Sequence, residues 1–129
     1  MVPCREVRAN PDATLDIIGT IDFWWFNELP GRLAFRLAVA IEASEFESGE
    51  WKHPELHLVD PDGATQRIAA VVVEIGPKSE AGARWTKYLS IPVDITTGVA
   101  GEFVLQMRAG ETVLASTSMT VVKRSPVPA

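Results

Sequence analysis

The sequence predicts an all-β protein whose strands pack as two facing sheets. Apolar and polar residues alternate over several stretches, turn-forming residues separate those stretches, and residues 101–122 have the pattern of a β-hairpin. The loop of this hairpin is Ala109-Gly110-Glu111, with a glycine available for a positive φ. One face of each hairpin strand is apolar: Phe103, Leu105 and Met107 on the first, and Val113, Ala115, Thr117, Met119 and Val121 on the second.

The segments before this hairpin divide into a lead, a domain and a tail. Residues 1–12 are polar and contain two prolines, so we expect them to lead into the domain rather than join its core. The domain is expected to span residues 13–122, and residues 123–129 to form a polar, proline-containing tail. Within the apolar run 14–26 the alternation changes phase at Gly19, which predicts a β-bulge or a strand break there.

Residues 32–43 carry the longest regular alternation in the chain. A helix is the alternative, since alanine and leucine both favour one, but a helix would scatter the large apolar residues around its circumference. A strand places them all on one face, so the pattern predicts a strand. These residues are Leu33, Phe35, Leu37, Val39 and Ile41.

The middle of the chain predicts three further strands. In the first, Glu55, His57 and Val59 face away from the leucines between them, and the turn Asp60-Pro61-Asp62-Gly63 follows. A strand from about Gln66 to Ile75 is β-branched at its centre. The third, residues 85–95, contains Pro92, which cannot donate to a ladder and therefore indicates an edge strand or a bulge.

About seven strands separated by turn signals are typical of an immunoglobulin-like antiparallel β-sandwich. The order LDIIGTIDFWWF, LAFRLAVAIEAS, ELHLVDPDGAT, GEFVLQM and LASTSMTVV resembles an uncharacterised bacterial family, a domain of unknown function found as small stand-alone immunoglobulin-like β-sandwich proteins. The resemblance implies this fold and transfers no activity and no catalytic residue. The Trp24-Trp25 pair departs from the smaller residues expected at that place.

Composition limits the classes of partner and compartment. The chain has 129 residues, one domain's length, with 47% hydrophobic and 22% charged residues and a net charge of −5. Scattered acidic residues argue against nucleic acid and anionic membranes as partners. The N-terminus lacks the apolar region of a signal peptide, and no run approaches the ~18 apolar residues of a membrane span. Because Cys4 is the single cysteine, we expect a reducing compartment, the cytoplasm.

No arrangement of residues predicts catalysis or a bound cofactor. His53, Glu55 and His57 could share one strand face, but i to i+4 along a strand spans ~13 Å, too far for both imidazoles to reach one metal ion. Asp60 and Asp62 belong to a turn, because the downstream acidic ligand of a calcium loop is missing. We therefore assign no catalytic, cofactor-binding or metal-binding residue, and expect no enzyme.

The run Phe23-Trp24-Trp25-Phe26 is the most informative feature for function. Four consecutive aromatics cannot all face one core in an extended chain, because successive side chains alternate. In one interpretation Phe23 and Trp25 fill the end of the sandwich while Trp24 and Phe26 lie under a loop. In a second the aromatics form a homodimer contact, and in a third they make a carbohydrate-stacking platform with Trp51.

The sequence therefore predicts a non-enzymatic protein-interaction or structural module that self-associates or binds another protein. Its predicted interaction surface is Phe23, Trp24, Trp25, Phe26 and Trp51. The alternative is a small-ligand or carbohydrate-binding module that uses the three tryptophans of this set. A metal hydrolase using His57 is a distant third interpretation.

Overall fold

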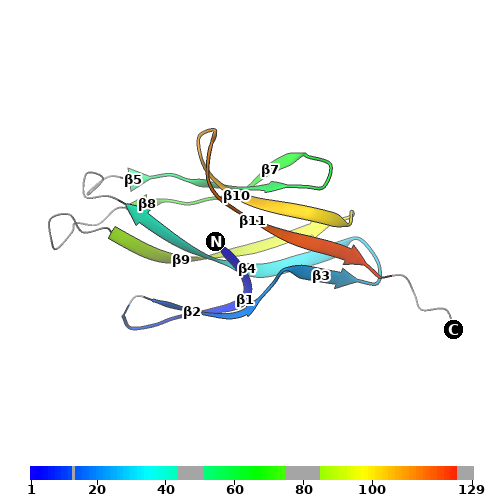
Figure 1. Ribbon diagram of the computed structural model, residues 1–129, viewed down its shortest axis with the longest axis horizontal. Coiled ribbons are helices and arrows are strands. Elements are labelled where there is room, and N and C mark those ends of the chain that lie inside the picture. Colours follow the sequence, from blue (N-terminus) through cyan, green and yellow to red (C-terminus); the bar gives the residue numbers. More distant parts are fainter. Residues whose placement is uncertain (13, 44–50, 75–84, 125–129) are drawn as a thin grey trace.

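A computed structural model describes residues 1–12, 14–43, 51–74 and 85–124, and it contains strands and turns with no helix in these ranges. Two sheets face each other (Figure 1), which confirms the predicted all-β sandwich. The four-stranded sheet has the order β2-β1-β4-β9, the five-stranded sheet the order β3-β11-β10-β6-β7, and β5 pairs with β8. The strands are β1 (Val2–Ala9), β2 (Leu15–Thr20), β3 (Phe23–Phe26), β4 (Gly31–Ala43), β5 (Trp51–Lys52), β6 (Glu55–Val59), β7 (Thr65–Ala70), β8 (Val73–Glu74), β9 (Trp85–Thr97), β10 (Gly101–Ala109) and β11 (Thr112–Lys123).

The core lies between the two sheets and comes from the alternating faces that the sequence indicates. β4 and β9 pair without a break from Gly31 opposite Thr97 to Ala43 opposite Trp85. The strand predicted over 32–43 is thus confirmed, and its odd-numbered residues supply one wall of the core. The opposite wall comes from β6, β10 and β11. The buried cluster is Ile21, Leu33, Phe35, Leu37, Val39, Leu56, Leu58, Ile91, Val93, Phe103, Leu105, Met107, Met119 and Val121.

The N-terminal segment differs from the expected lead. Residues Val2 to Ala9 form β1, which pairs with β2 on one side and, through Val2 to Cys4, with β4 on the other. Cys4 is fully buried, its thiol lies 3.4 Å from the carbonyl oxygen of Arg36, and burial raises the pKa of this thiol. A polar composition hid this strand because only its first few residues cross the core.

The strand break in the run 14–26 falls after Gly19 rather than at it. Gly19 has φ 69° but remains inside β2, and the chain leaves the four-stranded sheet at Ile21-Asp22. There the N–H of Ile21 donates to Pro3, while the carbonyl of Asp22 accepts from Thr120 of the other sheet. Two consecutive residues therefore bond to opposite sheets, and β3 begins in the second layer.

The predicted strand 66–75 is also interrupted. β7 ends at Ala70, and the N–H of Val71 donates to the carbonyl of Pro54 before the chain enters β8. Val72, with 61% of its surface exposed, lies at this break. The β-branched residues in 66–75 could not predict the interruption between β7 and β8, because valine and isoleucine favour strands in either sheet.

Two predicted features of the C-terminal half are confirmed. β9, which contains Pro92, is the last strand of its sheet. β10 and β11 form the expected hairpin, with Gly110 at φ 61° in the turn. A register shift leaves Leu114 with no opposite residue in β10, and Val113 is 46% exposed although the alternation placed it with the apolar face.

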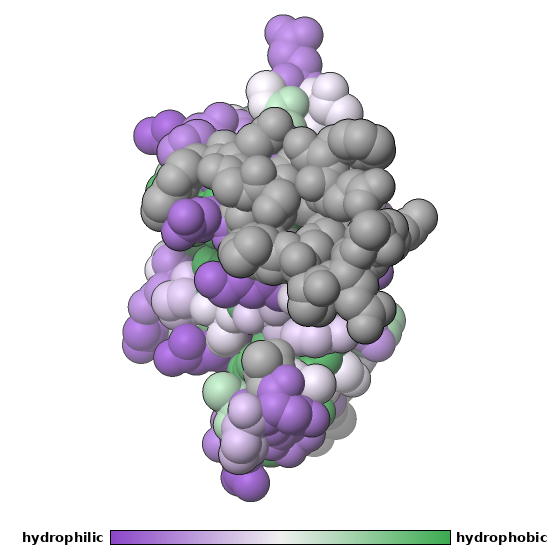
Figure 2. Space-filling view, turned by 90° about the vertical axis from the view of Figure 1, so that its left-hand side faces the viewer, coloured by the Kyte–Doolittle hydropathy of each residue, from purple (hydrophilic) through white to green (hydrophobic). Residues whose placement is uncertain are grey.

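The strands exceed the expected number of about seven for three reasons: β1 replaces the expected lead, the short β5 was not indicated, and the predicted strands in 14–26 and 66–75 each divide in two. The hairpin of β1 and β2 lies at the bottom of the view in Figure 1, and the β10–β11 hairpin projects from the top. Figure 2 views the molecule from the left-hand side of Figure 1 and shows hydrophilic residues on both projecting tips. The predicted tail, 123–129, lies outside the described residues after Arg124.

Candidate interaction surface

β3 lies at the edge of the five-stranded sheet, where it pairs in parallel with the last residues of β11. In this register Phe23 lies opposite Thr120, Trp24 opposite Val121, and Trp25 opposite Val122. Val121 is buried in the core, so its neighbour Trp24 also faces inward. The pairing with β11 therefore decides which aromatics of the run reach the core.

The inward aromatics pack against the core. Trp24 stacks on Phe26 with centroids 6.4 Å apart, and it contacts the buried Phe35 at 6.0 Å. The indole N–H of Trp24 points to the sulfur of Met119 at 3.3 Å. Phe26 in turn covers Gly31, where an added Cβ would come within 2.7 Å of its ring. Trp24 and Phe26 therefore fill the space between β3 and the core.

The outward aromatics remain accessible. Phe23 and Trp25 are each 56% exposed, and their rings stack with centroids 6.2 Å apart and 26° between their planes. The guanidinium of Arg124 lies 4.9 Å from the centre of the Trp25 ring, within cation–π range. We call Phe23, Trp25 and Arg124 the β3 patch.

The interpretation in which Phe23 and Trp25 fill the end of the sandwich is wrong, because Trp24 and Phe26 take that role and the other two face outward. The alternation was correctly predicted, but its sense was reversed. Arg124 was missed by sequence reasoning, since it follows the last strand and meets Trp25 only through the parallel pairing of β3 with β11. Trp51 begins β5, and its side chain lies outside the described part of the structure.

Glu55 and His57 lie on the outer face of the five-stranded sheet, as the alternation in β6 predicts. Arg67 of β7 donates to Glu55 Oε2 at 2.9 Å, and His57 Nε2 lies 3.8 Å from Glu55 Oε1. The hydrogen bond from Arg67 holds the pKa of the Glu55 carboxyl below its usual range, helped by the nearby charges of Arg67 and His57. This carboxylate is therefore engaged by an arginine.

Replacing Arg67 by methionine should raise the pKa of Glu55 toward that of a free glutamate, about 4.3. A carboxyl whose pKa is lowered by folding contributes stability above its unfolded-state pKa and loses it as the pH falls through the folded-state value. The variant should therefore lose less stability on acidification. Carboxyl NMR titration measures the shift in the pKa of Glu55.

The matched control is Arg32→Met. Arg32 donates hydrogen bonds of 2.8 and 2.6 Å to Asp94 and lowers its pKa, so this variant should raise the pKa of Asp94 instead. An unchanged Glu55 titration would contradict the assignment.

The other polar motifs occupy separate places. His53 lies between β5 and β6 and lines a cavity rather than the sheet face that carries His57. Asp60 Oδ1 accepts the N–H groups of Asp62 and Ala64 at 3.0 and 2.9 Å, which confirms the predicted turn. Within the described ranges, no group of three or more His, Cys, Asp or Glu side chains could hold a metal ion.

These features define the molecule as an all-β sandwich with an exposed aromatic patch on an edge strand. Among the described residues, no helix is long and apolar enough to cross a membrane. Comparisons of the chain with protein-family models, with curated proteins and with solved structures found no match.

Proposed function

We propose that this protein is a non-enzymatic interaction module that self-associates through the β3 patch. The observation that supports the proposal is the outward pair Phe23 and Trp25, two large aromatics that are each 56% exposed and stacked on one another. Burying apolar surface stabilises an association by roughly 25 cal/mol per Å² before the costs of binding are subtracted. Removing these two rings from water would therefore favour association.

The residue types agree with a protein partner. Tryptophan and arginine are enriched among the residues that contribute most to binding at interfaces, and the β3 patch pairs one with the other. Val122, opposite Trp25 in register, is half-buried and extends the patch onto β11. Two copies related by a twofold axis would place the same patch on both sides of the contact, which is the commonest arrangement of homodimers.

The carbohydrate-binding alternative has less support. Trp24 is turned toward the core and bonded to Met119, so it cannot offer a free ring face. One face of Trp25 is covered by Arg124, which leaves less of the ring for stacking on a sugar. A glycan panel read by tryptophan fluorescence remains the test of this alternative.

The experiment that tests self-association is analytical ultracentrifugation of the Trp25→Ser variant across a micromolar concentration range. Because Trp25 lies at the centre of the patch, we expect the dimer to weaken by about 30-fold or more, the equivalent of a 2 kcal/mol contact. Tyr88→Ser is the matched control, since Tyr88 is an aromatic of similar exposure, 43%, on the other sheet. It should leave the dimer unchanged.

A wild-type chain that remains monomeric at these concentrations would overturn the proposal. Equal weakening by Trp25→Ser and Tyr88→Ser would place the contact elsewhere. Trp24→Ser is a poor probe, because its loss from the core should destabilise the fold itself. The melting temperature of each variant therefore accompanies its mass.

We also infer that the sandwich is immunoglobulin-like. In such folds strands A, B and E share one sheet, while C, F and G share the other. The orders β1-β4-β9 and β11-β10-β6-β7 fit these sets if β1 is A, β4 is B, β6 is C, β9 is E, β10 is F and β11 is G. β7 is then the added C′ strand. β2 is an insertion between strand A (β1) and β3, the short strand beside strand G. Membership of the bacterial family that the sequence resembles remains a prediction.

A further inference from the structure

One side of β11 is unpaired over most of its length. β3 runs beside β11 only from Thr120 to Lys123, and β10 occupies the opposite side. Along residues 112–119 no strand of the described chain lies on the β3 side of β11. An unpaired edge presents N–H and C=O groups that can pair with another extended chain.

This edge lacks most devices that keep other edges from pairing. Proteins protect edges with charged residues and prolines. β9 carries Lys87 and Pro92, β7 carries Arg67, and β2 carries Asp16. Residues 112–119, TVLASTSM, contain neither a charge nor a proline. Their one interruption is the bulge at Leu114, which leaves this leucine 58% exposed.

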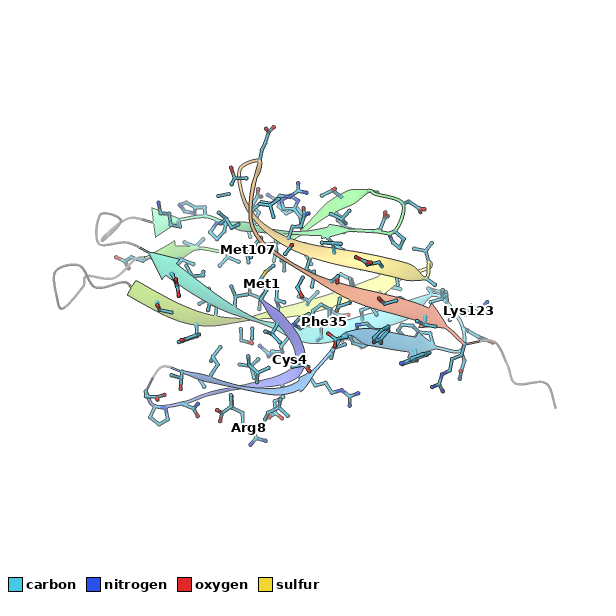
Figure 3. All side chains as sticks on the ribbon, viewed as in Figure 1. Met1, Cys4, Arg8, Phe35, Met107 and Lys123 are labelled. Carbon is cyan, nitrogen blue, oxygen red and sulfur yellow. The ribbon has the colours of Figure 1, made fainter. Side chains whose placement is uncertain are left out.

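A cavity of about 570 Å³ opens beside the unpaired edge. Leu114 and Ala115 of β11 form one wall, and Val39 and Ile41 near the end of β4 form another. Met1, which precedes β1, and Met107 of β10 also line the cavity, and both are labelled in Figure 3. The cavity therefore lies between the two sheets near the hairpin end of β11, where a strand added beside Leu114 and Ala115 would direct its inward side chains.

We propose that this edge and cavity bind an extended segment of a partner protein by strand addition to β11. Main-chain hydrogen bonds to the edge supply affinity in this mode of recognition, and pockets for alternate side chains supply specificity. Eight extended residues span about 26 Å, so the segment would pair along residues 112–119. Its alternate residues are apolar and of valine or leucine size, because the walls that receive them are aliphatic.

The positions of the ionisable side chains around the cavity indicate which residues of the segment are uncharged. The ionisable side chains that line the cavity come from the end of β4 (Glu42), from β5 (Lys52) and from the link between β5 and β6 (His53). The walls made by β10 and β11 contribute apolar side chains and backbone. The inward residues of the segment that lie along β11 are therefore uncharged.

The space beside the edge favours a peptide over a second copy of the chain. The inward side chains of a second copy's β11, such as the buried Met119, are already packed in its own core and could not enter the cavity. An extended segment reaches both the edge and the cavity, so it gains hydrogen bonds and apolar contacts together. This inference is independent of the β3 patch, which faces outward on another strand.

The test uses a fluorescently labelled peptide, Lys-Thr-Val-Thr-Val-Thr-Val-Thr-Lys, and the full chain. We expect binding on the order of 10 μM, the weak end of specific recognition. Leu114→Glu should weaken binding at least tenfold. Val99→Glu is the control: it changes the net charge equally at an apolar residue of similar exposure, 41%, away from the cavity, and should leave binding unchanged. Trp25→Ser should bind like the wild type, which separates this inference from the proposed self-association.

Two peptides methylated at alternate backbone nitrogens distinguish strand addition from cavity filling. Strand addition requires one set of N–H groups, so one peptide should lose binding and the other should keep it. Amide exchange of residues 112–119 should slow when the parent peptide binds. Equal binding by both methylated peptides, or no change in exchange along β11, would overturn the inference. So would a concentration-dependent mass that Leu114→Glu reduces in a chain that binds no peptide, since the edge would then pair with a second copy.

Discussion

Phe103→Ala should lower the free energy of unfolding by about 3–5 kcal/mol, the range for removing a large aromatic from a packed core. Phe103 is 2% exposed and lies on β10 opposite Met119, so its ring fills the space between the sheets. A domain of this size is stable by about 5–15 kcal/mol in total. The variant should therefore unfold at a much lower denaturant concentration, with midpoint and slope measured by urea titration.

Phe23→Ala is the matched control, since it removes the same side chain from a position that is 56% exposed. Its effect on the free energy of unfolding should be below about 1 kcal/mol, measured at concentrations where the chain is monomeric. Comparable losses in the two variants would contradict the placement of Phe103 in the core and of Phe23 on the surface. The pair thus tests the inward and outward faces of the five-stranded sheet with one chemical change.

The sequence predicted a strand and its buried face correctly where one long element carries a regular alternation of apolar and polar residues. β4 was predicted because its odd-numbered residues, Leu33 among them, hold one period over the whole strand, and burial of that face needs only a second sheet. β1 failed for the opposite reason. Only its first residues cross the core, with Cys4 fully buried and Arg5 and Glu6 exposed, so its polar composition concealed a strand held by pairing on both sides.

The candidate surface was predicted in part. Alternation alone requires two of the four aromatics to face each way, but the sense depends on the register of β3 against β11, which joins residues about a hundred positions apart. The position of Arg124 over Trp25 follows from the same pairing. The open edge of β11 could not be predicted either, because the hairpin pattern of 101–122 does not tell where β3 stops covering it.

Gly101→Ala should cost about 2–6 kcal/mol of unfolding free energy, although the substitution adds a single methyl group. Gly101 opens β10 with φ 134°, a conformation that other residues rarely adopt, and strain of this kind costs about 1–3 kcal/mol. An added Cβ would also come within 2.8 Å of the Pro61 ring in the β6–β7 turn, and such overpacking costs about 1–3 kcal/mol more. Thermal or urea unfolding of the variant measures the sum.

Gly110→Ala separates these two causes. Gly110 has φ 61° in the β10–β11 turn, and no atom lies within 4 Å of the Cβ that would be added. Only backbone strain remains, so this variant should lose about 1–2 kcal/mol. Pairing Gly101→Ala with Pro61→Ala should recover part of the larger loss, because the ring that meets the new methyl group is removed. If Gly101→Ala costs no more than Gly110→Ala, the contact between the start of β10 and the β6–β7 turn is not as close as the structure places it.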